Sequence, residues 1–141
     1  MKRVAVLLWL ALVLVVSTHW AGEAQQPPAA SADDLHFTGK TVTMDGKALT
    51  VARRHFEPGA RSAWHSHEKG QLLMVEEGRM RTQKRGQAVK ELGVGESDYT
   101  GPNLVHWHGA VPGQALVQIN VGFGGETKWM EKVTEAEYSR K

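Results

Sequence analysis

Arg61-Ser-Ala-Trp-His-Ser-His-Glu-Lys-Gly-Gln-Leu-Leu-Met-Val-Glu-Glu-Gly78 is the stretch around which the rest of the chain is organised. Within it, His65 and His67 are separated by one residue. Because side chains at i and i+2 of a strand point to the same face, both imidazoles would project together. Gln71 follows a turn and brings a side-chain oxygen toward that face. Two nitrogens and one oxygen from a single hairpin supply most of a metal site.

A second histidine pair occurs in the segment Leu104-Val-His-Trp-His-Gly109. His106 and His108 share one face of the expected strand, and Trp107 points to the other. A lone histidine is more often a structural residue, but two alternating pairs on strands are hard to explain in that way. The two pairs therefore predict a metal site that uses at least three of the four histidines.

Short strands separated by turn residues recur along the chain, and no long helical period occurs before Lys128. This pattern predicts an all-β sandwich or barrel. Thr134 and Glu137 have the spacing of a capping box, which predicts a short C-terminal helix. The expected strands cover residues 41–44, 49–56, 61–67, 71–75, 79–83, 87–92, 98–100, 105–110 and 115–121.

The chain begins with Met-Lys-Arg and continues with an unbroken apolar run from Val4 to Val16. A basic start, a short apolar segment and the ending Gly22-Glu-Ala24 are typical of a secretory signal, and the run is short for a membrane span. Such a protein would be exported, periplasmic or secreted, with no stable membrane anchor once the signal is cleaved. We expect a signal peptide over 1–24, a linker over 25–34, one barrel domain over 35–125 and a C-terminal extension with a short helix over 126–141.

Charge and cysteine usage exclude two kinds of interaction. The chain has no cysteine and therefore forms no disulfide. Removal of the signal would take away Lys2, Arg3 and Glu23 and leave 15 basic and 14 acidic residues. A chain so close to charge balance lacks the basic footprint of a nucleic-acid-binding protein. We expect a small-molecule substrate as the partner, and the edge strands of a barrel are also compatible with a homodimer.

The two histidine segments resemble the motifs of the cupin superfamily. The first motif is matched in every spacing, with glutamine at the position of an acidic ligand, by Gly59, His65, His67, Gln71 and Gly78. The second motif is matched in spacing by Gly95, Gly101, Asn103 and His106. The resemblance spans about Phe37 to Gly124 and implies a single-domain cupin, which is a double-stranded β-helix or jelly-roll barrel. It implies that the metal ligands are His65, His67, Gln71 and His106.

A narrower resemblance is to the small bacterial cupins that act as manganese-dependent hydroxynitrile lyases. It is carried by residues 56–67, Gly70-Gln71, 106–110 and 129–134. Those enzymes bind the metal with three histidines and a glutamine, so the resemblance favours manganese as the divalent cofactor. Iron, nickel or zinc would also suit nitrogen and oxygen ligands. On the last barrel strand, where that family carries a further histidine, this chain has Gln118.

This resemblance implies a lyase that cleaves cyanohydrins such as mandelonitrile to an aldehyde and cyanide. A neutral glutamine ligand leaves the charge of a dication uncompensated, which strengthens it as a Lewis acid toward a substrate hydroxyl. His108 is the candidate base that takes the hydroxyl proton, or else it hydrogen-bonds the ligands. Gln118 would face inward and either hydrogen-bond the leaving group or line the pocket. The alternatives are an iron-dependent oxygenase and a non-catalytic cupin that binds a small ligand or a metal.

Apolar side chains on several strands are candidates for the barrel wall. They are Leu73, Val75, Val51, Val105, Ile119 and Val121, with the parity of each strand left open. Trp64 and Trp107 neighbour the histidines in sequence, so we expect them to face away from the site and to pack elsewhere.

Overall fold

The structure, a computed structural model, describes residues 36–39 and 41–140. The expected signal peptide over 1–24 and most of what precedes the barrel, including the linker over 25–34, lie outside the described residues. Of the two units into which the chain divides, the second, Thr43–Lys141, contains all of the described strands. No helix in the described part is long and apolar enough to cross a membrane.

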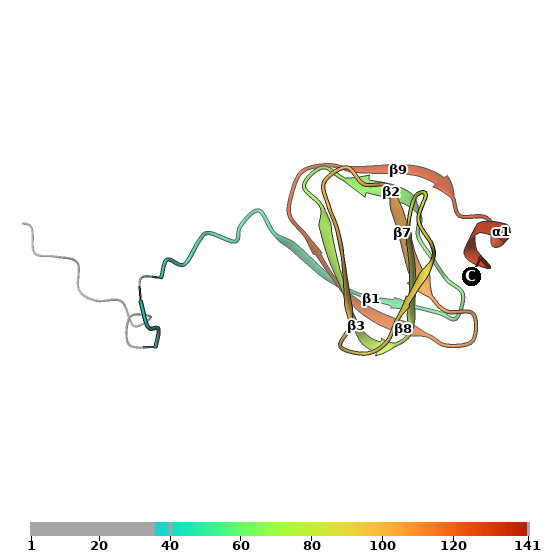
Figure 1. The fold of residues 1–141 in the computed structure, drawn as a ribbon, viewed down its shortest axis with the longest axis horizontal. Coiled ribbons are helices and arrows are strands. Elements are labelled where there is room, and N and C mark those ends of the chain that lie inside the picture. The colour runs from blue at the N-terminus through green and yellow to red at the C-terminus, as the bar shows by residue number, and fades with distance from the viewer. Residues whose placement is uncertain (1–35, 40, 141) are drawn as a thin grey trace, which may run out of the picture. The chain divides into compact units, whose positions relative to one another are not determined.

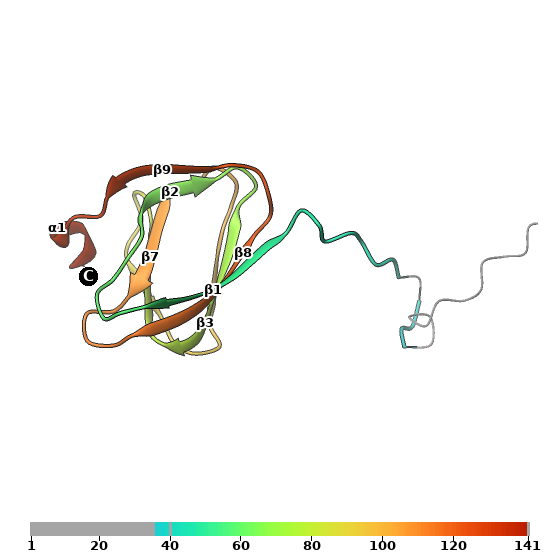
Figure 2. The ribbon, with the colours of Figure 1, turned by 180° about the vertical axis from the view of Figure 1, so that it is seen from behind.

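The second unit consists almost entirely of antiparallel strands. These are β1 (Thr50–Phe56), β2 (Ala63–His67), β3 (Gln71–Gly78), β4 (Met80–Lys84), β5 (Lys90–Leu92), β6 (Ser97–Thr100), β7 (His106–Ala110), β8 (Leu116–Gly122) and β9 (Thr127–Lys132), followed by the helix α1 (Glu135–Tyr138). One sheet has the order β1-β8-β3-β6 and the other β5-β4-β7-β2-β9. The two sheets curve around a common interior (Figures 1 and 2). The predicted all-β fold with a short C-terminal helix is confirmed.

Two segments differ from the sequence prediction. Residues 41–44, which were expected to form a strand, are not part of any strand in the structure. The strand β9 lies in the segment assigned to a C-terminal extension, yet it pairs with β2 and forms an edge of the five-stranded sheet. All six residues of β9 are exposed, so its sequence lacks the alternation that identifies a half-buried strand.

An apolar core fills part of the interior and joins the two sheets. Leu73 and Val75, which were expected in the barrel wall, both belong to it. Phe56 and Leu92 pack against it from the ends of their strands. Its buried members are Leu73, Val75, Met80, Ala110 and Leu116.

The set of alternating β1 residues that faces the interior is not the set that was expected. Val51 faces outward and is 69% exposed, because the alternate residues from Thr50 to Phe56 line the interior cavity instead. On β8 the fully buried residues are Leu116 and Gln118. Gln118 therefore faces inward, and the two wall candidates on β8, Ile119 and Val121, lie on the opposite face. The last candidate, Val105, packs against Trp64 and Trp107 on the outer side of the other sheet.

A second apolar cluster covers the outer face of the five-stranded sheet. Trp64 and Trp107 pack edge to face with their ring centroids 6.5 Å apart, turned away from the histidines as predicted. The helix α1 covers them, and the Tyr138 hydroxyl donates a hydrogen bond to Ala110 O at 2.6 Å. Thr134 caps this helix with the predicted capping box. The strands that carry the histidines are thus packed from behind.

We expect Gly78→Ala to destabilise the barrel strongly. Gly78 has φ +78°, and an added Cβ would lie 1.8 Å from Ala115 O, so the strand pairing there would have to open. The cost should be on the order of 3 kcal/mol in the free energy of unfolding, measured by urea denaturation. Gly86 is the matched control: its φ is +83°, nothing lies within 4 Å of an added Cβ, and Gly86→Ala should cost only about 1 kcal/mol of backbone strain. Equal losses in the two variants would contradict the role of close packing at Gly78.

Candidate metal centre

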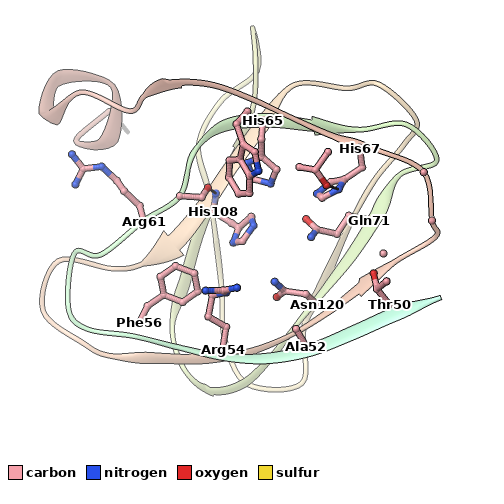
Figure 3. Close-up of a pocket in the computed structure, with 16 residues that line it drawn as sticks. Thr50, Ala52, Arg54, Phe56, Arg61, His65, His67, Gln71, His108 and Asn120 are labelled. Atoms are coloured by element: carbon pink, nitrogen blue, oxygen red, sulfur yellow. Dashed lines mark hydrogen bonds between the residues drawn. The ribbon is translucent and has the colours of Figure 1, made fainter. Parts of the chain in front are cut away.

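The strands β2 and β7 place three imidazoles at one point of the interior. His65 and His106 lie opposite each other across the two strands, and His108 follows on the same face of β7. One ring nitrogen from each lies within 4.8 Å of the other two, and all three residues are buried. Figure 3 shows the rings of His65, His67 and His108 turned toward the same region of the cavity. The three buried histidines could hold a metal ion.

Backbone carbonyls fix the ring proton of two of these histidines. His65 Nδ1 donates a hydrogen bond to Ala63 O at 2.9 Å, and His106 Nδ1 donates to Leu104 O at 3.3 Å. A carbonyl oxygen can only accept, so each neutral ring carries its hydrogen on Nδ1 and its lone pair on Nε2. The Nε2 atoms are therefore oriented and free to bind a cation.

His67 and Gln71 add two more donor atoms. His67 Nδ1 lies 3.0 Å from Thr127 Oγ1, while its buried Nε2 has no hydrogen-bond partner among the described residues. Gln71 Oε1 lies 3.1 Å from His106 Nε2. Gln71 Oε1 and His106 Nε2 both carry lone pairs and neither carries a hydrogen. Their contact is therefore unfavourable unless a positive charge lies between them.

The spacing of these donors fits a shared metal ion. Two ligand atoms at right angles on a metal, each about 2.1 Å from it, are about 3 Å apart. The contact between Gln71 Oε1 and His106 Nε2 has that length. The buried Nε2 of His67, which has no partner among the described residues, could supply another nitrogen to the same ion. A divalent cation is thus the group that this donor set fits.

Burial keeps the imidazoles neutral. It lowers the pKa of His65 to about 4 and that of His106 to about 3, with a smaller contribution from the neighbouring histidines. Burial also lowers the pKa of His67. The pKa of His108 lies well below its ordinary value of 6.5, first because of burial and then because of His65 and His106. All four rings are neutral at pH 7, as metal binding requires.

Gln118 lies behind His108. Its Nε2 donates to His108 Nδ1 at 2.9 Å and to Asn120 Oδ1 at 2.5 Å, and the residue is fully buried. Because the amide donates to Nδ1, the neutral ring of His108 carries its hydrogen on Nε2, unlike His65 and His106. His108 therefore differs from these two histidines in the placement of its proton.

A cavity of about 450 Å³ opens onto the cluster. Its lining residues come from both sheets, and none of those in the described part is an aspartate or a glutamate. Two are arginines, Arg54 and Arg61. Trp129 lines one side, with its ring centroid 4.7 Å from that of His65. The cavity is large enough for a small organic substrate.

The side chains selected from the sequence all lie in this region. His65, His67, Gln71 and His108 line the cavity, whereas His106 and Gln118 are fully buried behind its surface. Gln118 contacts His108 and Asn120 instead of lining the pocket. Whether each side chain has the chemical role assigned to it stays a prediction.

Several residues of the cavity were not identified from the sequence, among them Arg54, Thr127 and Trp129. Arg54 could have been found by counting back from Phe56 in steps of two, because both face the interior. Thr127 and Trp129 carried no such signal, because the exposed strand β9 shows no alternation.

Comparison with known proteins places the chain in a family. The family model of the cupin domain matches residues 52–121. An (R)-mandelonitrile lyase from Granulicella tundricola is 42% identical over 88 residues, which cover 60% of this chain and 67% of that protein. The chain is a cupin.

Solved structures agree with this assignment. A cupin-like protein from Thermotoga maritima is 42% identical and superimposes with a TM-score of 0.63, covering 64% of this cupin and 71% of the other chain. A DMSP lyase from Ruegeria pomeroyi is 13% identical, with a TM-score of 0.54 over 62% of this cupin and 46% of the other chain. At that identity the second likeness shows the fold alone.

Acid should destabilise the metal-free cupin. In the folded protein the pKa of His65 is about 4 and that of His106 is about 3, whereas both should be near 6.5 in the unfolded chain. Between these folded-state values and pH 6.5, the unfolded chain therefore binds more protons than the folded protein does. The free energy of unfolding should be highest above pH 6.5 and should fall by up to about 1.4 kcal/mol per histidine for each pH unit below it. Urea denaturation in the presence of a chelator, from about pH 7.5 to about pH 4.5, measures this. The control is His55→Gln at an exposed position, which should leave the slope of the free energy of unfolding against pH unchanged. A free energy of unfolding that did not depend on pH would contradict the argument from burial.

Proposed function

We propose that this cupin is a metal-dependent lyase of the hydroxynitrile lyase type, which cleaves cyanohydrins such as mandelonitrile to an aldehyde and cyanide. The observation that carries the proposal is the buried cluster of His65, His106 and His108. Gln71 Oε1 lies against His106, and His67 Nε2, which has no partner in the described part of the chain, is buried in the same region. The name of the relative that is 42% identical, (R)-mandelonitrile lyase, supports the same class of reaction.

In this proposal Gln71 Oε1 and three imidazole nitrogens would hold a divalent ion, and the proposed ion is manganese. The nitrogens are the Nε2 atoms of His65, His67 and His106. When bound, the ion supplies a Lewis acid that lowers the pKa of a substrate hydroxyl. Because all four donors are neutral, they leave the positive charge of the ion uncompensated. A glutamate in place of Gln71 would cancel one unit of that charge.

His108 moves the proton. Its Nε2 takes the proton of the substrate hydroxyl, and the electron pair of that O–H bond forms the carbonyl of the aldehyde. The bond between the hydroxyl-bearing carbon and the nitrile breaks, and its electron pair leaves with cyanide. Cyanide then takes the proton from the imidazolium and departs as hydrogen cyanide. Burial lowers the pKa of His108, so the ring returns readily to its neutral form.

Gln118 positions the proton on His108. Accepting a proton at Nε2 requires a neutral ring with its hydrogen on Nδ1. A half-rotation of the Gln118 amide would present Oε1 to that hydrogen, and Oε1 is buried without a partner in the present arrangement. The orientation of this amide therefore decides whether His108 offers a donor or an acceptor on its Nε2 side. Gln118 acts through His108 and has no contact of its own with the substrate.

Replacement of two histidines on β7 separates metal binding from proton transfer. We expect His108→Ala to keep its metal and to lose at least about 100-fold in kcat for mandelonitrile, because a general base typically contributes that much. His106→Ala should lose both the metal and the activity, because its Nε2 faces Gln71 Oε1 in the donor set. Cyanide release and elemental analysis of the same purified samples measure the two effects.

The exposed His55, on the outward face of β1, gives the control: His55→Ala should keep both metal and rate. If His108→Ala lost its metal as His106→Ala does, His108 would be a ligand and the proposed base would be wrong. If the metal-loaded wild type released no cyanide, the lyase proposal would fail. Oxygen consumption that depended on iron would then support an oxygenase.

Gln71→Glu tests the value of a neutral ligand. The variant keeps an oxygen donor in place but adds a negative charge, so the ion should bind more tightly and act as a weaker Lewis acid. We expect slower loss of metal to a chelator and a kcat lower by about tenfold, which corresponds to about 1.4 kcal/mol in the barrier. Gln87→Glu adds the same charge at an exposed position outside the cavity lining and should change neither. A kcat of Gln71→Glu equal to or higher than that of the wild type would contradict the argument that a neutral ligand speeds the reaction.

A further inference from the structure

Arg54 projects from β1 into the cavity. The residues at alternate positions of this strand, Thr50, Ala52, Arg54 and Phe56, all line the cavity. Figure 3 shows the guanidinium of Arg54 between Phe56 and Asn120, below the ring of His108 in this view. The register of β1 on β8 places Arg54 opposite Gln118, the residue that hydrogen-bonds His108.

The charge of Arg54 has no partner in the described part of the chain, where the guanidinium forms neither a hydrogen bond nor an ion pair. Its neighbour Arg53 faces outward, and Arg53 Nε lies 2.6 Å from Glu76 Oε2. The other arginine of the cavity, Arg61, pairs with Glu135 at 2.7 Å and donates to Val133 O at 3.1 Å. Arg54 alone of these three is unpaired, and it is the one whose guanidinium lies within the cavity.

The rest of the cavity adds no negative charge. None of its described lining residues is an aspartate or a glutamate, and the donors of the proposed metal site are neutral. A divalent ion at those donors would raise the positive charge further. In a partly enclosed site such a charge favours an anionic ligand, and a guanidinium binds a carboxylate through two parallel hydrogen bonds.

We propose that the substrate of this site carries a carboxylate in addition to its hydroxyl, and that Arg54 binds this carboxylate. This inference rests on the proposed function, in which the hydroxyl of the substrate lies at the metal. The substrate class is then a small hydroxy acid, such as a cyanohydrin with a carboxylate at the far end. A single unpaired arginine matches the single charge of a carboxylate better than the double charge of a phosphate.

Binding of matched acids and amides to the full, metal-loaded chain tests this inference. The probes are 3-hydroxypropanoate, 4-hydroxybutanoate and 5-hydroxypentanoate, each compared with its neutral amide by isothermal titration calorimetry. A 2-hydroxy acid is avoided, because its carboxylate would reach the metal together with its hydroxyl. We expect the wild type to bind at least one acid about tenfold more tightly than the amide, as a charge-assisted hydrogen-bond pair would give.

Two neighbouring arginines provide the variant and its control. Arg54→Gln should remove the preference for the acid, whereas Arg53→Gln removes the same charge one residue away on the outer face and should preserve it. Equal binding of acid and amide by the wild type would overturn the inference. A preference that survived in Arg54→Gln would overturn it as well, because the metal would then hold the carboxylate.

The outcome is independent of the lyase reaction. Mandelonitrile is neutral, so cyanide release from it tests the proposed function without Arg54. An Arg54-dependent preference for acids in a protein that releases no cyanide would sustain the carboxylate site and refute the lyase. Cyanide release without such a preference would sustain the lyase and refute the carboxylate site.

Discussion

In the interior of this barrel, nitrogen and oxygen atoms that carry lone pairs lie close together, and no hydrogen lies between them. The Nδ1 hydrogens of His65 and His106 are committed to backbone carbonyls, so the Nε2 atoms face inward as acceptors. Gln71 Oε1 meets one of them at 3.1 Å. Protonation would relieve the repulsion, but burial disfavours a charged ring and lowers both pKa values. A bound cation would satisfy all of these atoms at once, and binding of such a cation would therefore stabilise the barrel.

The strand β7 supports the donors from behind as well as presenting them. Its histidines face the interior, while Trp107 between them packs against Trp64 and under the C-terminal helix. Tyr138 ties that helix to the end of the strand through Ala110 O. Packing on the outer face therefore restricts the movement of the strand whose inner face carries the site. Donor atoms on a strand held in this way keep their spacing better than donors on a loop.

The sequence was sufficient for features that depend on local periodicity. The alternation of His65 with His67 and of His106 with His108 placed these side chains together, and the capping box at Thr134 located the helix. The sequence was insufficient where a strand far away in the chain decides which face of a strand points inward or which strand it pairs with. Val51 was expected inside, but pairing with β8 turns the other face of β1 inward. The edge strand β9 is exposed throughout, so burial left no pattern in its sequence.

The neutral ligand set and Arg54 affect the cavity in the same direction. Neutral donors would leave the charge of a bound cation uncompensated, and Arg54 adds a further positive charge, so together they would favour an anion at the site. A fully buried arginine without a partner would be costly, but Arg54 is exposed to solvent through the open cavity. Water can therefore solvate the guanidinium in the free protein, and the proposed carboxylate would replace that water. Hydration in the free state explains how the fold keeps an unpaired charge close to the histidine cluster, and the charge would act fully only when a ligand excludes the solvent.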